Sequence, residues 1–417
     1  MNPRPRPVQD RTTKTRQKIF EGAIEVLARG GVAGVTHRAV ADTGGVSLAA
    51  TTYHFDSKSE ILTHVSRTLL SGYLETFRHL QARVVAGTET GLGALDDLVL
   101  RVVLNAIGRE RTRSLAWCEL ILHGGREAEG RILAQDWYAE LDKIWLSIGR
   151  HLDPSATQRE ASAAVDLSIG LTLLFHPLDL GRETAVQLFR GALVPEDLAV
   201  PGLAGEGAPA ASGSASGPAV ARYREARARI VAAAIDVLVE RGRMAVSYRS
   251  VAERAGLVRS GPAYYFPSIG TLLEVAQHAL LARTTGRYLA TLESLPPESL
   301  DEAGLADLST TLYFREILEH GQENIGFYAI CATAAQTPAL RPALMAALVD
   351  QHRAWSRLLA VVGQGGPHRA AALRLQALLA GKTIRAVATG ADTALLARAR
   401  DDFAIAIRGA GPGRAGI

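Results

Sequence analysis

Sulfur is scarce in this sequence, which holds two cysteines, Cys118 and Cys331, among 417 residues. Two thiols are too few for a disulfide framework or for a zinc site of four thiolates. Sparse cysteine suits a reducing compartment. We therefore expect a cytoplasmic protein that needs no metal and no other cofactor.

Long apolar segments are also missing. The most apolar window, residues 163–175, is shorter than a bilayer span and contains Asp166, which favours a buried core helix over a membrane segment. The basic residues at the start of the chain are followed by no apolar stretch of the kind that a signal peptide requires. We expect neither membrane association nor secretion.

Catalytic motifs are absent as well. The sequence contains no His-Glu-x-x-His and no Gly-x-Ser-x-Gly. Gly381-Lys382-Thr383 has the form of the end of a phosphate loop, but Gln376 stands where the first glycine is required. We expect a protein that is not an enzyme.

Positive charge is modest over the whole chain, at a formal net charge of +4, but it is concentrated in two segments. Residues 1–18 hold six basic residues and one acidic residue, and residues 222–259 hold nine basic and four acidic residues. Local basic segments in a nearly neutral chain indicate either polyanion binding at defined places or solvated helix faces.

The chain repeats itself at a constant offset without a gap. Gly45 aligns with Gly256 and Phe55 with Phe266, and many residues around them align at the same separation. We call the number of residues from Gly45 to Gly256 the repeat offset, and two residues separated by it are called equivalent. So long a period indicates duplicated domains and not a stack of short repeats. Between the copies, residues 201–218 are rich in glycine, alanine, serine and proline, which predicts a flexible linker that lets two halves pack side by side.

Each copy has the same pattern of short helices. In the first copy, Thr36 stands in cap position before a short helix that Gly45 ends, and Ser247 takes the cap position in the second copy. The next segment, residues 47–55, is long enough for about two helical turns and too polar to be core throughout. A short polar helix held by two packed helices is typical of the recognition helix of a helix-turn-helix.

These residues carry a resemblance to a known family. The segments Thr36-His37-Arg38-Ala39-Val40-Ala41, Gly45-Val46-Ser47 and Tyr53-His54-Phe55-Asp56-Ser57-Lys58 resemble the DNA-binding signature of the TetR family of bacterial repressors. Residues 247–252, 256 and 264–268 are similar to the same signature in a more diverged form. The resemblance implies an all-helical protein whose regulatory domains pair, so that two recognition helices lie on one face.

We therefore predict an all-α protein with two helix-turn-helix heads, each followed by a helical regulatory domain, whose halves pair as an intramolecular pseudo-dimer. The predicted parts are a basic arm at 1–14, a first head at 15–63, its regulatory domain at 64–198, a linker at 199–221, a second head at 222–275, its regulatory domain at 276–408 and a tail at 409–417.

The predicted DNA contacts are helix caps, basic and aromatic residues beside phosphates, and the exposed faces of the recognition helices. In the first copy they are Thr36, Arg38, Ser47, Leu48, Ala49, Ala50, Thr51, Thr52, Tyr53, His54 and Lys58. In the second copy they are Ser247, Arg249, Arg259, Ser260, Gly261, Tyr264 and Tyr265.

The second copy departs from the signature. Val258 replaces the capping serine, Pro262 falls inside the expected helix and Ile269 replaces the lysine. In one alternative, the recognition helix begins late, with Ser260 as its cap, and Arg259 reads guanine. In the other, this head contacts only the DNA backbone and reads no bases. Both alternatives predict an asymmetric, nearly palindromic operator.

Several bulky or sulfur-containing residues are candidates for an effector cavity, because members of the family bind small hydrophobic molecules among these helices. The candidates are Trp117, Cys118, His123, Trp137 and Phe175 in the first half, and Tyr328, Cys331 and Trp355 in the second. The same residues also suit plain core packing.

The function expected from the sequence is a ligand-responsive repressor in which one chain binds one double-stranded DNA operator and an unknown small molecule releases it. The first alternative is a homodimer of chains that uses only the first head, with the second half as a ligand sensor. The second alternative is a protein-interaction module that no longer contacts DNA.

Overall fold

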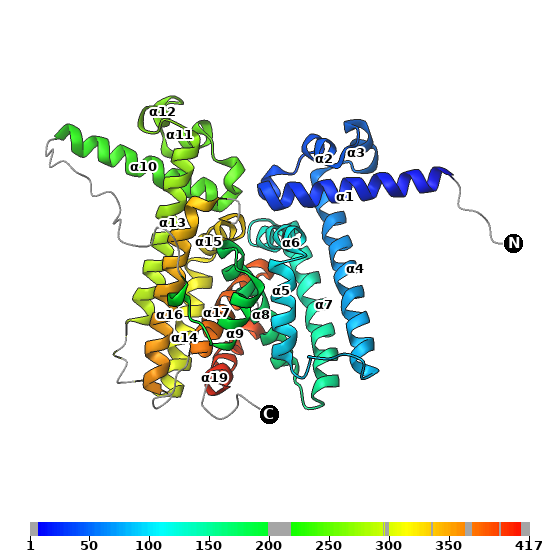
Figure 1. Cartoon of the computed structure of the whole chain (residues 1–417). Coiled ribbons are helices and arrows are strands. Elements are labelled where there is room, and N and C mark those ends of the chain that lie inside the picture. Colours follow the sequence, from blue (N-terminus) through cyan, green and yellow to red (C-terminus); the bar gives the residue numbers. More distant parts are fainter. Residues whose placement is uncertain are drawn as a thin grey trace.

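Apolar residues at helical spacing run through most of the chain, and in the computed structural model they form helices. The structure describes residues 7–198, 218–294, 300–334, 337–362, 369–391 and 393–409, together with Pro296, and every regular element among them is helical. Figure 1 shows two small groups of short helices at one end of the molecule and long helices running away from them.

The first run of helices extends to residue 197. Its elements are α1 (Pro7–Gly34), α2 (His37–Gly44), α3 (Leu48–His54), α4 (Lys58–Val85), α5 (Leu95–Ile107), α6 (Arg111–Gly124), α7 (Ala128–Leu152), α8 (Gln158–Phe175), η1 (His176–Leu178), α9 (Arg182–Arg190) and η2 (Pro195–Asp197).

The second run begins at residue 218. Its elements are α10 (Pro218–Arg241), η3 (Arg243–Ala245), α11 (Tyr248–Ala255), α12 (Gly261–Tyr265), α13 (Ile269–Leu292), α14 (Glu302–Leu318), α15 (Gly321–Ala334), η5 (Pro338–Leu340), α16 (Arg341–Val362), α17 (Arg369–Thr389), α18 (Thr393–Ala397) and α19 (Ala399–Gly409).

The two runs correspond at the repeat offset that the sequence shows. Helices α2 and α11 are separated by this offset at both their first and their last residues. Helices α8 and α17, far beyond the aligned head segments, also begin one repeat offset apart. The correspondence of helix order and position therefore extends from the short helices through the long ones.

Helices α8 and α17 cross at the centre of the molecule, where two glycines allow their backbones to meet. A Cβ atom at Gly170 would lie 1.8 Å from the carbonyl oxygen of Ala377, and one at Gly381 would lie 1.8 Å from that of Asp166. The repeat offset separates Gly170 from Gly381, and it also separates Asp166 from Ala377. Gly170 thus contacts the equivalent of Asp166, and Asp166 itself contacts the equivalent of Gly170. Residues pair reciprocally in this way in an isologous interface.

A buried ion network also joins the two runs. The Arg385 guanidinium of α17 donates to Asp166 Oδ1 at 2.6 Å and to both carboxylate oxygens of Asp142 at 2.8 and 3.0 Å. Burial lowers the pKa of Arg385, but the two carboxylates outweigh it and hold this pKa above its ordinary value. Because Arg385 is the partner of both carboxylates, removing it would leave Asp142 without this ion pair and Asp166 with only Lys382 at 3.9 Å.

Apolar packing is continuous across the same crossing. Ile169 and Leu171 of α8 belong to one cluster with Leu373 and Ala377 of α17. Residues Gln158–Leu178 form one candidate membrane span by length and composition, but 72% of its most apolar window is buried inside the protein. This burial fits a core helix, as the aspartate in the window predicted.

The boundaries of three predicted parts differ from the helices. Helix α1 already begins at Pro7, within the predicted basic arm, and residues 1–6 lie outside the described residues. Helix α10 begins at Pro218, so the end of the predicted linker is helical, and residues 199–217 lie outside the described residues. Of the predicted tail, the structure describes Gly409, the end of α19.

Replacing Gly170 by alanine tests the backbone contact at the crossing. The added Cβ would overlap the carbonyl oxygen of Ala377, so α8 and α17 would have to move apart. We expect a loss of about 3 kcal/mol in the free energy of unfolding, measured by urea denaturation.

The matched control is Gly286→Ala, in the middle of α13, where an added Cβ meets no described atom within 4 Å. It should leave stability unchanged or raise it by up to about 1 kcal/mol, because alanine favours a helix more than glycine does. Equal midpoints for the two variants would show that the crossing does not need a glycine.

Candidate nucleic-acid interface and effector cavity

Side-chain caps define the short helices of the first head. Thr36 Oγ1 accepts a hydrogen bond from the Ala39 N–H at 3.1 Å and begins α2, and Ser47 Oγ accepts one from the Ala50 N–H at 3.1 Å and begins α3. Gly45 between the two helices has φ 62°, a left-handed conformation that favours glycine. The predicted cap residues therefore set the angle at which α3 leaves α2.

A second set of contacts holds the end of α3. His37 Nε2 lies 2.9 Å from the carbonyl oxygen of Phe55, and the Arg16 guanidinium lies over the Phe55 ring at 5.4 Å. The same brace occurs again one repeat offset later in the chain. There the Tyr248 hydroxyl donates to the carbonyl oxygen of Phe266 at 2.9 Å, and Arg227 lies over the Phe266 ring at 4.9 Å.

The outer face of α3 carries residues predicted to contact DNA. Tyr53 is 83% exposed, Leu48 is 44% exposed, and Ala49 and Thr52 are also exposed, while Ala50 and His54 are partly buried. Arg38, on the neighbouring helix α2, is exposed as well. Small side chains at the start of this helix allow a close approach to another surface. An exposed tyrosine beside them can donate a hydrogen bond to a phosphate.

Two predicted contacts in the first head face elsewhere. Thr51 is 0% exposed, and its hydroxyl donates to the carbonyl oxygen of Leu48 at 2.7 Å, so it stabilises α3 from inside. Lys58 lines a cavity beside α6, where burial lowers its pKa and Glu127 partly offsets this. Neither residue therefore belongs to the exposed face of α3.

The predicted second head follows the late-start alternative. Helix α12 begins at Gly261 with Pro262 in its first turn, and Ser260 precedes it in right-handed helical conformation, without a side-chain cap bond to any described residue. Tyr264 is 78% exposed, like its equivalent Tyr53. Ser247 caps α11 through the Ser250 N–H at 3.1 Å, as Thr36 caps α2.

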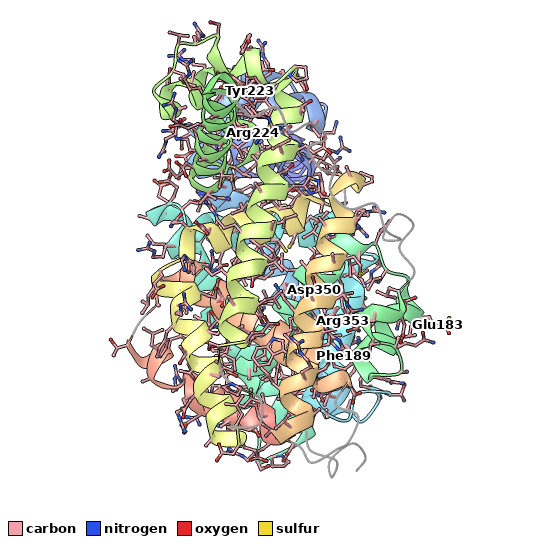
Figure 2. The ribbon with its side chains drawn as sticks, turned by 90° about the vertical axis from the view of Figure 1, so that its left-hand side faces the viewer. Glu183, Phe189, Tyr223, Arg224, Asp350 and Arg353 are labelled. Carbon is pink, nitrogen blue, oxygen red and sulfur yellow. The ribbon has the colours of Figure 1, made fainter. Side chains whose placement is uncertain are left out.

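Other predicted contacts of the second head have different surroundings. Arg259 is exposed in the turn before α12, and Tyr265 is partly buried with its ring 4.9 Å from that of Tyr223. Arg249 is exposed and pairs with Glu253 at 2.9 Å. Figure 2 shows Tyr223 and Arg224 at the head end, and Asp350 and Arg353 on the helical body.

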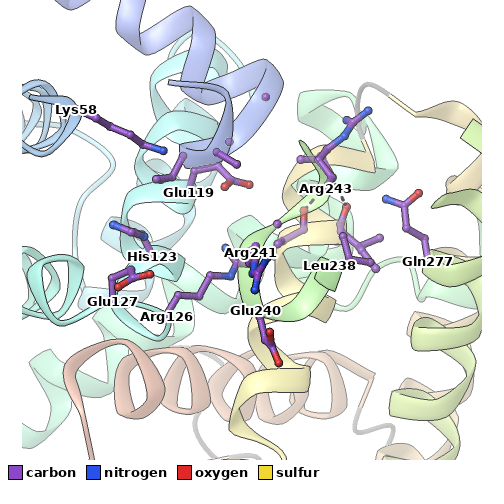
Figure 3. Close-up of a pocket in the computed structure, with 18 residues that line it drawn as sticks. Lys58, Glu119, His123, Arg126, Glu127, Leu238, Glu240, Arg241, Arg243 and Gln277 are labelled. Atoms are coloured by element: carbon purple, nitrogen blue, oxygen red, sulfur yellow. Dashed lines mark hydrogen bonds between the residues drawn. The ribbon is translucent and has the colours of Figure 1, made fainter. Parts of the chain in front are cut away.

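The end of α1 meets η3 beside a cavity of about 180 Å³. Figure 3 shows Glu119, His123 and Arg126 of the first run facing Arg243 of the second. The Val32 N–H donates to Glu119, whose pKa is raised by burial, and Arg126 Nε donates to the carbonyl oxygen of Val239 at 2.9 Å. The predicted ligand residue His123 lies here, apart from the other candidates.

A larger cavity of about 410 Å³ lies among α1, α4, α5, α6, α7 and α8. It brings together Trp117 and Trp137, both predicted as ligand contacts. The Trp137 indole N–H donates to Ser66 Oγ at 2.9 Å, whereas that of Trp117 is buried without a hydrogen-bond partner among the described residues. An acceptor on a bound molecule would satisfy this donor.

The remaining ligand candidates lie in the core or beside a narrower space. Cys118, Phe175 and Cys331 are buried, and burial raises the pKa of Cys331 to about 12, which keeps its thiol protonated. The Trp355 indole donates to the Tyr288 hydroxyl at 2.8 Å. Tyr328 lines a cavity of about 20 Å³, room for about one water molecule.

Several residues of the larger cavity were not predicted from the sequence. They are aromatic or polar residues of α1, α4 and α7, namely Gln17, Phe20, Tyr73, Phe77 and Trp145. Apolar periodicity assigns such residues to a core, and it does not distinguish a filled core from a hollow one. A search for charge differences at the repeat offset would not have found them either, because their equivalent positions are also uncharged.

His176 gives this region a pH dependence that can be measured. It is buried, its Nε2 lies 2.9 Å from Ser114 Oγ at the cavity wall, and burial together with Arg111 lowers its pKa to about 3. The unfolded chain takes up this proton below pH 6.5 and the folded protein does not. The free energy of unfolding should therefore fall as the pH drops from 6.5 toward 3.

Replacing His176 by asparagine should remove most of this contribution, seen as a smaller slope of stability against pH in urea denaturation. His79→Gln is the matched control, because this imidazole is exposed on α4. Equal slopes for the His176→Asn variant and the wild type would contradict the assignment.

Comparison with known proteins adds one finding to this geometry. Residues 19–65 match the family described as bacterial regulatory proteins, tetR family. The matched segment contains α2, α3 and the first turns of α4. No curated protein matches the chain. The match supports a DNA-binding transcriptional regulator of the TetR type, with its helix-turn-helix domain near the N-terminus.

Proposed function

We propose that this chain is a ligand-responsive repressor of the TetR type in which a single polypeptide supplies both DNA-binding heads. The observation that carries the proposal is the correspondence of the two runs of helices at the repeat offset. The second head is α10 to α12 with the start of α13, and one chain forms a pseudo-dimer around the crossing of α8 and α17.

The contacts within each head support this proposal. Arg16, His37 and Phe55 form a brace in the first head, and the equivalent positions of the second head form the same brace. A brace kept at equivalent positions would hold α12 as it holds α3. The exchanged contacts of Gly170 and Gly381 support pairing about a local twofold axis.

The two heads would prefer different half-sites. Helix α3 presents alanine and threonine side chains, which suit thymine methyl groups, whereas α12 is shorter and is preceded by the exposed Arg259, which suits guanine. The expected operator is a near-palindrome whose halves differ. The exposed Tyr53 and Tyr264 would contact phosphates in both halves.

The larger cavity suits the effector. Gln17 and Phe20 of α1 line it, so a molecule bound among α4 to α8 would touch the helix that carries the first head. A ligand that binds more tightly when the head is displaced would lower DNA affinity by the same coupling factor. Release of the operator would then be a population shift.

One observation favours the alternative in which the second half has lost base recognition. Helix α12 has five residues and Ser260 forms no cap bond to a described residue, so its recognition surface is smaller than that of α3. In that case chains would associate to bring two first heads to one operator, and the second half would act as a ligand sensor or bind a protein partner.

Stoichiometry separates the two arrangements. A bound sequence selected from a random duplex pool should form a complex containing one chain per duplex, measured by light scattering, with unequal half-sites in the selected consensus. Two chains on each duplex and a perfect palindrome would instead support the homodimer of chains.

Substitutions in the heads test DNA binding itself. Arg38→Ala and Tyr53→Ala should each weaken binding about tenfold in gel shifts, because each removes a contact to the duplex. A lost phosphate contact should also reduce the steepness of the salt dependence by about one unit. Tyr264→Ala should likewise weaken binding uniformly across sequences, because it removes a phosphate contact at the other half-site.

Arg78→Ala is the matched control, since this exposed arginine lies about five helical turns along α4 from the head. It should leave affinity unchanged. Wild-type protein that does not bind duplex DNA at low salt, or that binds it without salt dependence, would refute a DNA-binding function.

A further inference from the structure

The two cavities in the helical bodies occupy equivalent places. Of the residues that line the cavity of about 20 Å³, most lie one repeat offset after a residue that lines the cavity of about 410 Å³. Tyr288 stands where Phe77 stands, Glu316 where Asn105 stands and Tyr328 where Trp117 stands. The chain therefore has the same chamber twice, open in the first half and nearly filled in the second.

A buried ion pair stands at the second chamber, which Glu316 lines. Arg287 Nε and Nη2 donate to the two oxygens of Glu316 at 3.1 and 2.9 Å, and the side chains of the pair are 12% and 4% exposed. Asn324 Nδ2 donates to Glu316 Oε2 at 2.8 Å and to its backbone carbonyl at 2.7 Å. Two charges that satisfy each other in this way exclude a third molecule from the same space.

The first half cannot form this pair. The positions equivalent to Arg287 and Glu316 are Thr76 and Asn105, which are shorter and uncharged. The space they leave is lined by aromatic rings, among them Phe77 and Trp145, and by Trp117, whose indole N–H finds no acceptor among the described residues. The charged residues of its lining, Arg109, Glu110 and Arg113, pair with one another, and Arg113 also pairs with Glu21. Its chemistry therefore suits an uncharged aromatic molecule that carries a hydrogen-bond acceptor.

We propose that each chain binds one effector, an uncharged aromatic molecule with an acceptor group, in the first chamber, and that the Arg287 and Glu316 pair closes the second chamber. This inference rests on the effector role proposed above for the first chamber. One ligand per two heads makes regulation asymmetric, because only the head carried by α1 is contacted.

The test exchanges the charged pair of the second chamber with its equivalents in the first. The double variant Arg287→Thr with Glu316→Asn gives the second chamber the residues of the first at these two positions, and Thr76→Arg with Asn105→Glu does the reverse. Removing both members of a buried pair leaves no lone charge, so the fold should tolerate the first exchange. Glu323, the other partner of Arg287, keeps Arg283 at 3.0 Å.

The probe is prodan, an uncharged naphthalene ketone whose fluorescence rises in apolar surroundings and whose carbonyl oxygen can accept from Trp117. Calorimetric titration should give one prodan per wild-type chain, two per Arg287→Thr/Glu316→Asn chain and none per Thr76→Arg/Asn105→Glu chain. Trp117→Phe, which keeps a ring and removes the donor, should weaken the single wild-type site several-fold.

Two prodan sites in the wild type, or a single site in a folded Arg287→Thr/Glu316→Asn chain, would overturn the proposal. No binding to the wild type at saturating prodan would overturn the ligand chemistry. Circular dichroism establishes folding for each variant. Gel shifts without prodan measure DNA binding independently of prodan binding. A failure of DNA binding is therefore distinguished from a failure of the one-effector inference.

Discussion

The backbone contact between α8 and α17 is the constraint on which the arrangement of the molecule depends. Gly170 and Gly381 let the backbones of the two helices approach closely, and a side chain at either position would overlap a carbonyl oxygen of the other helix. Arg385 adds a directed contact from α17 to Asp166 and Asp142 at the same place. Because the long helices pack around this crossing, it also determines where the short helices at one end of the molecule lie relative to each other.

Around this shared framework, equivalent positions carry different chemistry. Glu119 is buried where the two runs meet beside η3, and its equivalent position holds Ile330. Thr76 lines an open cavity, and its equivalent Arg287 forms a buried ion pair with Glu316. The α2 and α11 caps, by contrast, are alike, since Thr36 and Ser247 both bind a backbone N–H. Backbone geometry is thus common to both halves, while the polar and cavity-lining groups are not.

Local sequence patterns predicted the caps of the short helices α2 and α3 and the turn between them. Thr36, Ser47 and Gly45 act within three or four residues of their own positions, so their roles can be recognised from the sequence. The burial of Thr51 and the orientation of Lys58 depend on which face of a helix packs inward, and a short polar segment does not specify that face. Arg287 and Glu316 are 29 residues apart, and only the folded chain brings them together. An empty volume such as the chamber beside Trp117 leaves no periodic signal at all.

The exchanged contacts at the crossing have an evolutionary consequence. In an assembly of two identical chains, every substitution appears on both sides of the axis, so a bulky or charged residue near the axis must be compatible with its own copy. Two halves on one polypeptide mutate independently. Arg385 can therefore occupy one side while Leu174, its equivalent, remains apolar on the other. Under the function proposed above, such freedom would let one half keep an open effector cavity while the equivalent space in the other half is closed.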